Sequence, residues 1–132
     1  MRLRLLILTF ALLAACSKSR EADWDRAIAD LTEALDSGKL PPKEQAVALY
    51  DRGTGRLRKG EFDAAIADLD ASLKADPGQA DAFVNRSIAR RARGDLDGAF
   101  ADADAALRLD PNNAKALVQR GVAQVARQDF DK

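Results

Sequence analysis

The side chains that most often do chemistry are scarce in this chain, and their scarcity limits the reactions that it could perform. Its 132 residues contain one Cys and no His, and Lys plus Arg equal Asp plus Glu at 21 each. Without His, the most common general base and metal ligand is missing, and a single Cys can form neither an internal disulfide nor a structural zinc site. The balanced charge provides no basic field for nucleic acid. Cys16 and the recurring Arg and Asp side chains are therefore the residues whose roles need explaining.

No arrangement of residues in the sequence predicts an active site. A Gly-rich phosphate loop, metal-ligand spacing and a nucleophile–base pair are all missing. The neighbouring carboxylates Asp102 and Asp104 would point to different faces of a helix. We therefore expect no enzymatic activity, cofactor, metal or small-molecule substrate. Any activity would belong to a partner, or to a catalytic part outside this chain.

Cys16 closes an N-terminal segment with the pattern of an export signal. Arg2 and Arg4 precede residues 5–15, which are uncharged and mostly apolar. This run is shorter than the roughly 20 residues that a membrane-spanning helix needs, but it suits the apolar region of a secretory signal. The sequence LAAC at residues 13–16 resembles the lipoprotein box of bacterial lipoproteins.

That resemblance implies that residues 1–15 are removed, that Cys16 receives lipid, and that residues 16–22 form a tether. Two or more acyl chains would hold the protein stably on a membrane. Ser17 and Lys18 follow the cysteine where the family's inner-membrane signal has Asp, which favours the outer membrane facing the periplasm. The alternative is an ordinary secretory signal that is cut just after Cys16 or Ser17, leaving a periplasmic or secreted protein.

A repeat of 34 residues organises the chain after residue 22. Residues 46–79 and 80–113 align without a gap and share many identities, and residues 114–132 match the beginning of the same pattern. The preceding residues 23–38 match only its second half. A repeat at this period indicates a solenoid, in which each unit adds one supersecondary structure to a continuous core.

Each full unit predicts two helices joined by a tight turn. The turns are marked by Gly60 and Gly94, because glycine readily adopts the left-handed conformation just beyond a helix end. The first helices share a small residue at one position, which predicts close approach of the paired helices: Gly53, Ser87 and Gly121.

The pattern resembles the tetratricopeptide repeat, a helix–turn–helix unit of this length. The resemblance rests on the small position, on Ala65 and Ala99, and on the closing Pro77 and Pro111. It implies an all-α fold, a right-handed superhelical solenoid of antiparallel helix pairs. About six helices would span residues 23–132: a half repeat, two full repeats and a partial repeat. Because the last residues open a second helix, we expect the sequence to be part of a longer product.

The same resemblance implies that the concave face binds a peptide segment or helix of another protein. In the family, fixed positions of the first helices line this face. Transferred residue by residue, these positions are Tyr50, Thr54, Leu57, Arg58, Val84, Ile88, Arg91, Lys115, Val118, Val122 and Val125. Their composition predicts a largely apolar groove.

Two features of this groove need separate interpretation. Val118, Val122 and Val125 form an apolar stripe that could either line the groove or pack against a further part of the chain or a neighbouring molecule. The family's clamp for C-terminal carboxylates is incomplete. Asn85 and Lys115 match it, whereas the other three positions hold Tyr50, Thr54 and Gln119.

The periodic charges also allow two interpretations. Arg52, Arg86 and Arg120 could form a basic ladder for an anionic ligand, or they could pair with the recurring Asp68 and Asp102. We favour ion pairs between helices, which would fix the register of packing. Overall, we expect a non-catalytic protein–protein interaction scaffold, lipid-anchored in the bacterial envelope. The alternative is a soluble periplasmic repeat protein with a chaperone-like role.

Overall fold

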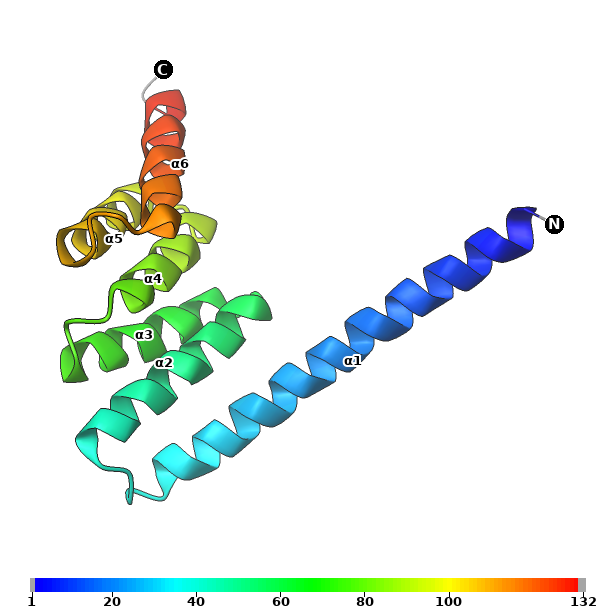
Figure 1. The fold of residues 1–132 in the computed structure, drawn as a ribbon, viewed down its shortest axis with the longest axis horizontal. Coiled ribbons are helices and arrows are strands. Elements are labelled where there is room, and N and C mark those ends of the chain that lie inside the picture. Colours follow the sequence, from blue (N-terminus) through cyan, green and yellow to red (C-terminus); the bar gives the residue numbers. More distant parts are fainter. Residues whose placement is uncertain (1, 131–132) are drawn as a thin grey trace.

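The computed structural model describes residues 2–130, and the side chains of residues 18–128. The described residues form six α-helices and no strand: α1 (Arg2–Asp36), α2 (Pro42–Arg58), α3 (Phe62–Ala75), α4 (Ala80–Ala92), α5 (Leu96–Leu109) and α6 (Ala114–Phe130). Successive helices pack against one another, and α1 and α6 lie at opposite ends of the array (Figure 1). The predicted all-α solenoid is confirmed.

Two helix boundaries differ from the predicted ones: α2 begins before residue 46, where the repeat unit starts, and α1 extends through the expected tether. Helix α2 begins at Pro42, because proline at the first helical position has no N–H to leave unpaired and already has a helical φ. Helix α1 runs without a break through residues 16–22, where we expected a tether. The side chain of Cys16 lies outside the side chains that the structure describes, so its lipidation stays a prediction.

The turns between paired helices have the conformation that the glycines predict. Gly60 and Gly94 have φ values of 78° and 84°. At the first turn, the N–H of Glu61 donates to the carbonyl of Arg56 at 2.9 Å, and that of Gly60 donates to Leu57 at 3.1 Å. This is a Schellman motif, which satisfies the last carbonyls of α2. The predicted role of these glycines is confirmed.

The paired helices approach closely at the shared small position. A Cβ atom added to Gly53 would lie 3.0 Å from Cγ of Leu69 and 3.2 Å from Cβ of Asp68. At the same position of α4, the hydroxyl of Ser87 donates to the carbonyl of Ala99 at 2.7 Å. A larger side chain would push α3 or α5 away, so the small residues permit the observed packing.

Ion pairs repeat along the solenoid together with the helices. Arg52 donates through Nε and Nη2 to Asp68 at 2.9 and 2.8 Å. Arg86 binds Asp102 in the same two-pronged way at 2.9 and 2.6 Å. Both carboxylates are almost fully buried, so each is satisfied by a charged partner rather than by water. Pairing between helices, the favoured interpretation, is confirmed for these two arginines.

The same arginines also reach back to the preceding unit. Nη1 of Arg86 lies 2.5 Å from Asp70, and Nη1 of Arg52 donates to the hydroxyl of Thr32 at 3.1 Å. Hydrogen bonding to Asp68 raises the pKa of Arg52. Burial alone would lower the pKa of Arg86, but Asp102 and Asp70 outweigh burial and raise it.

A second set of ion pairs joins the end of each first helix to the start of the preceding second helix. Arg93 contacts Asp63 at 2.7 Å, and Arg127 contacts Asp97 at 2.8 Å. The corresponding pair on α1 is Lys59 with Asp25, and its hydrogen bond raises the pKa of Lys59. Helix α1 therefore meets α2 as a second helix meets the first helix of the next unit.

Candidate partner-binding groove

The centre of the predicted groove is a hydrogen-bonded set of polar side chains on α2 and α4. Nδ2 of Asn85 donates to Oγ1 of Thr54 at 2.9 Å and lies 3.4 Å from the hydroxyl of Tyr50. All three side chains are half-buried. They fix the first helices of successive units relative to each other while keeping polar atoms within reach of a ligand.

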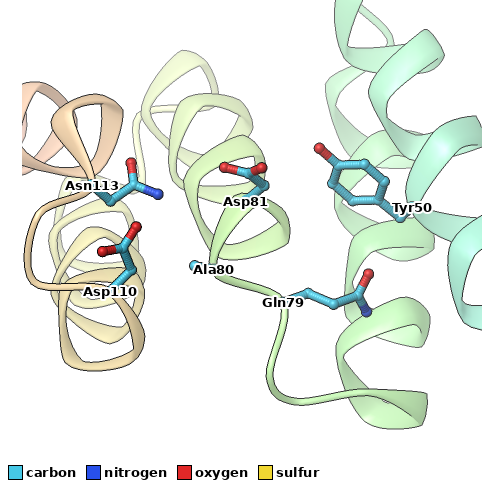
Figure 2. Close-up of a pocket in the computed structure, with 6 residues that line it drawn as sticks. All are labelled: Tyr50, Gln79, Ala80, Asp81, Asp110 and Asn113. Carbon is cyan, nitrogen blue, oxygen red and sulfur yellow. The ribbon is translucent and has the colours of Figure 1, made fainter.

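An open pocket of about 310 Å³ lies beside this set. It is lined by Tyr50, Gln79, Ala80, Asp81, Asp110 and Asn113. In Figure 2 the Tyr50 ring lies on one side of Asp81, and Asp110 and Asn113 lie on the other. The pocket therefore carries two carboxylates and several neutral hydrogen-bonding groups.

The hydroxyl of Tyr50 is held in its neutral form at this pocket. Burial raises the pKa of Tyr50, and the negative charge of Asp81 raises it further. Hydrogen bonds with Thr54 and Asn85 act in the opposite direction but do not reverse the shift. At neutral pH, Tyr50 therefore presents a phenol that can donate or accept a hydrogen bond.

Three polar residues that line the pocket from the links between helices were missed by the sequence reasoning. Gln79, Asp110 and Asn113 lie in the links that precede α4 and α6, whereas the transferred positions all lie within first helices. Their location gives a usable signal, because Asn113 accepts a hydrogen bond from the N–H of Ala116 at 3.0 Å, as a residue before a helix start does. The pocket is consequently more polar than the predicted groove.

Val84 was predicted to line the groove, and the structure shows otherwise. It is only 1% exposed and packs in the core with Ala106, Leu107 and Ala116. Its valine side chain is covered because α5 and α6 both reach it, so a partner cannot contact it in this fold. Val84 is a core residue.

The remaining predicted groove residues differ in accessibility. Leu57, Ile88 and Arg91 are half-buried, whereas Arg58 and Lys115 are exposed. Nε of Arg91 is buried, and no described group hydrogen-bonds to it. Within the described side chains, the available groove therefore combines polar atoms, partly covered aliphatic groups and exposed cations.

The valine stripe on α6 is separate in character from this polar centre. Val118, Val122 and Val125 are exposed, and Val118 is 59% exposed where its counterpart Val84 is 1% exposed. A shallow apolar hollow of about 540 Å³ lies over this helix. It is lined by Leu117, Val118, Gly121, Val122, Val125 and Ala126.

The described side chains contain no group of three metal-ligating residues close enough to hold a metal ion. Nor is any helix in that part of the chain both long and apolar enough to cross a bilayer. These findings cover only the described residues.

One comparison with known protein families supports the repeat over part of the chain. Residues 50–114 match the tetratricopeptide repeat family model. No curated protein has a significant match to the sequence.

Solved structures share the fold. The first tetratricopeptide domain of Spaghetti (RPAP3), bound to the HSP90 peptide SRMEEVD, is 25% identical over 81% of this chain and 82% of that one, with a TM-score of 0.74. The second such domain of human RPAP3, in complex with the HSP70 peptide SGPTIEEVD, is 25% identical over 79% and 83% of the two chains, with a TM-score of 0.71.

A third similar structure is that of the UNC-45 chaperone, which binds and folds muscle myosin. It is 26% identical over 84% of this chain but only 13% of that one, with a TM-score of 0.68. The family match over residues 50–114, the paired helices and the shared fold agree, so this chain has the fold of tetratricopeptide-repeat domains.

Proposed function

We propose that the protein is a non-catalytic interaction module whose groove between α2 and α4 binds a peptide segment of another protein. The observation that carries this proposal is the open pocket beside Tyr50, Thr54 and Asn85, where polar atoms converge on a concave site. Two domains of the same fold bind peptides, those of HSP90 and HSP70. A few fixed polar groups within a preformed groove are sufficient to orient an extended peptide.

The peptide bound here differs in charge from those two chaperone peptides. Both end in EEVD, and Asp81 and Asp110 at this pocket would repel an acidic terminus. The carboxylate-clamp positions also differ, because Tyr50, Thr54 and Gln119 stand where the clamp has cations and an amide. We infer a neutral or basic segment as the ligand.

Site-specific photocrosslinking in the native host tests the groove. A photoreactive residue in place of Thr54 should form a crosslinked product with one partner protein. The control is the same residue in place of Ala101, which is exposed on α5 outside the groove. Equal crosslinking from both positions, or none from residue 54, would refute binding in this groove.

We also propose that Cys16 is lipidated and anchors the module in the bacterial outer membrane, facing the periplasm. This proposal rests on the sequence LAAC at the end of an uncharged run of suitable length. Labelling with a radioactive fatty acid tests it, with Cys16→Ala as the matched control. Label that is lost in the variant would support the anchor, whereas an unlabelled periplasmic protein would favour the soluble alternative.

A further inference from the structure

Helix α6 is a first helix, and no second helix among the described residues covers its face. In α4, that face is covered by α5, and Val84 is buried under Ala106 and Leu107. On α6, the corresponding Val118 is exposed, and a Cβ added to Gly121 would meet nothing within 4 Å.

The charge on this face is also incompletely paired. Arg120 has an ion pair with Asp104 of the preceding unit, at 3.6 Å, and both side chains are about two-fifths exposed. Its counterpart Arg86 holds Asp70 in the same way but adds the two-pronged contact with Asp102. Among the described residues, α6 therefore lacks the second carboxylate that completes the arrangement in α4.

Helix α1 shows the opposite: over residues 24–36 it matches a second helix, and the described residues contain no first helix of the same unit. The sequence AIADLT at residues 27–32 aligns with AIADLD at residues 65–70 of α3. In α3, Ala65, Asp68 and Leu69 are buried against α2.

The aligned residues of α1 are more accessible. Ala27 and Leu31 are half-buried, and Asp30 is exposed. The contacts of α1 with α2 use other residues, such as Thr32 and Asp25, which serve the junction between successive units. Among the described residues, the side of α1 that would meet a first helix is thus only partly covered.

These two faces cannot satisfy each other within one copy. Helices α1 and α6 are at opposite ends of the array, and their described residues make no contact (Figure 1). We propose that residues 24–36 of α1 in one copy dock on α6 of a second copy, joining the copies head to tail as a continuous solenoid.

The internal helix pairs specify the register of this junction. Arg120 would bind Asp30 of the second copy, as Arg52 binds Asp68. Gly121 would face Ala27 and Leu31, as Gly53 faces Ala65 and Leu69. The hollow over Val118 would be filled by Ala34 and Leu35, the counterparts of Ala106 and Leu107.

The junction uses two different surfaces, so it is open-ended and permits species larger than a dimer. It is separate from the polar centre of the groove between α2 and α4. It also uses only α1 residues from 24 onward, so removal of residues 1–15 would leave it intact.

Disulfide trapping between copies of the full chain tests the register. In a Cys16→Ala background, one copy carries Gly121→Cys and another carries Leu31→Cys. Because Cγ of Leu69 lies 3.0 Å from a Cβ added to Gly53, the two sulfurs should meet, and oxidation should give the mixed dimer as the main product. The control pair replaces Gly121→Cys by Ala101→Cys, on the exposed surface of α5, and should give at least tenfold less.

Charge reversal tests whether Arg120 and Asp30 form the predicted pair. Arg120→Asp alone and Asp30→Arg alone should each weaken self-association, measured by sedimentation velocity, at least tenfold. Mixing the two variants should restore it, because every junction then contains one Arg and one Asp. Lys74→Asp, a reversal at an exposed lysine of α3, should leave association unchanged.

A protein that stays monomeric at high concentration would overturn the proposal, as would trapping that is equal for residues 121 and 101. Failure of the mixed charge variants to associate would do the same. Crosslinks from position 121 to another protein, or to a further part of a longer chain, would assign the face of α6 to that occupant instead.

Discussion

Helices α4 and α6 present the same positions of the repeat in two different surroundings. In α4 the small residue, the arginine and the valine are all covered by α5 and its neighbours, whereas in α6 the same positions are exposed. The difference shows that a residue's role in this solenoid depends on which helices flank it as much as on its type. The same repeat position holds a buried core valine in α4, Val84, and an exposed valine in α6, Val118.

The largest expected effect comes from breaking the covered ion pairs. Asp102→Ala leaves Arg86 and Arg90 without the buried carboxylate that both contact, and should lower the free energy of unfolding by about 3–5 kcal/mol. Asp104→Ala removes the exposed partner of Arg120 and should cost less than about 1 kcal/mol. Urea denaturation followed by circular dichroism measures both. Equal losses would abolish the distinction between α4 and α6.

The small position gives a second contrast. Gly53→Val places a branched side chain against Leu69 and Asp68 and should destabilise the protein by about 2 kcal/mol through overpacking. Gly121→Val enters open space in a helix and should change stability by less than about 0.5 kcal/mol. Thermal melts at low protein concentration, where copies are dissociated, provide the comparison. A large loss at Gly121 would mean that its surroundings are already filled.

The glycine turns at residues 60 and 94 should both be sensitive to substitution. They therefore provide a reference for the comparison of α4 with α6. Gly60→Val and Gly94→Val force a branched residue into a left-handed conformation, so each should cost about 1–2 kcal/mol. Gly78→Val is the control, because Gly78 has no positive φ. If all three variants melt at the wild-type temperature, the assigned turns are wrong.

The smallest expected effect lies at the groove. Asn85→Ala removes the hydrogen bond to Thr54 and should cost about 0.5–1.5 kcal/mol. The same change at Gln119, its counterpart in α6, removes a buried amide oxygen to which no described group donates, and should be neutral or slightly stabilising. Differential scanning calorimetry can separate these outcomes. A clear loss of stability in Gln119→Ala would indicate that this amide oxygen accepts a hydrogen bond that these contacts do not include.

Local sequence signals predicted most of the fold. The period, the glycine turns and the small position each have a direct physical cause in backbone conformation or close packing, and each is observed at Gly60, Gly94 and Gly53. The pairing of Arg52 and Arg86 was also predictable, because the charges recur at the same period as the helices.

The site was less predictable because it depends on contacts between units. The burial of Val84 follows from α5 and α6 arriving together, and a residue's place in a single helix does not contain that information. Gln79 and Asp110 line the pocket from links whose path is set by the stacking of whole units. Whether Cys16 carries lipid depends on processing, to which the fold adds nothing.

The contacts of Arg86 with two successive units have a consequence for how the protein unfolds. One guanidinium holds carboxylates from two successive units, so opening of the second unit also breaks an ion pair with the first. Fraying from either end is thus opposed at Arg86, and opening should spread unit by unit rather than helix by helix. Backbone amides in α3 and α5 should consequently exchange with solvent in linked steps, although no covalent contact other than the chain itself joins them.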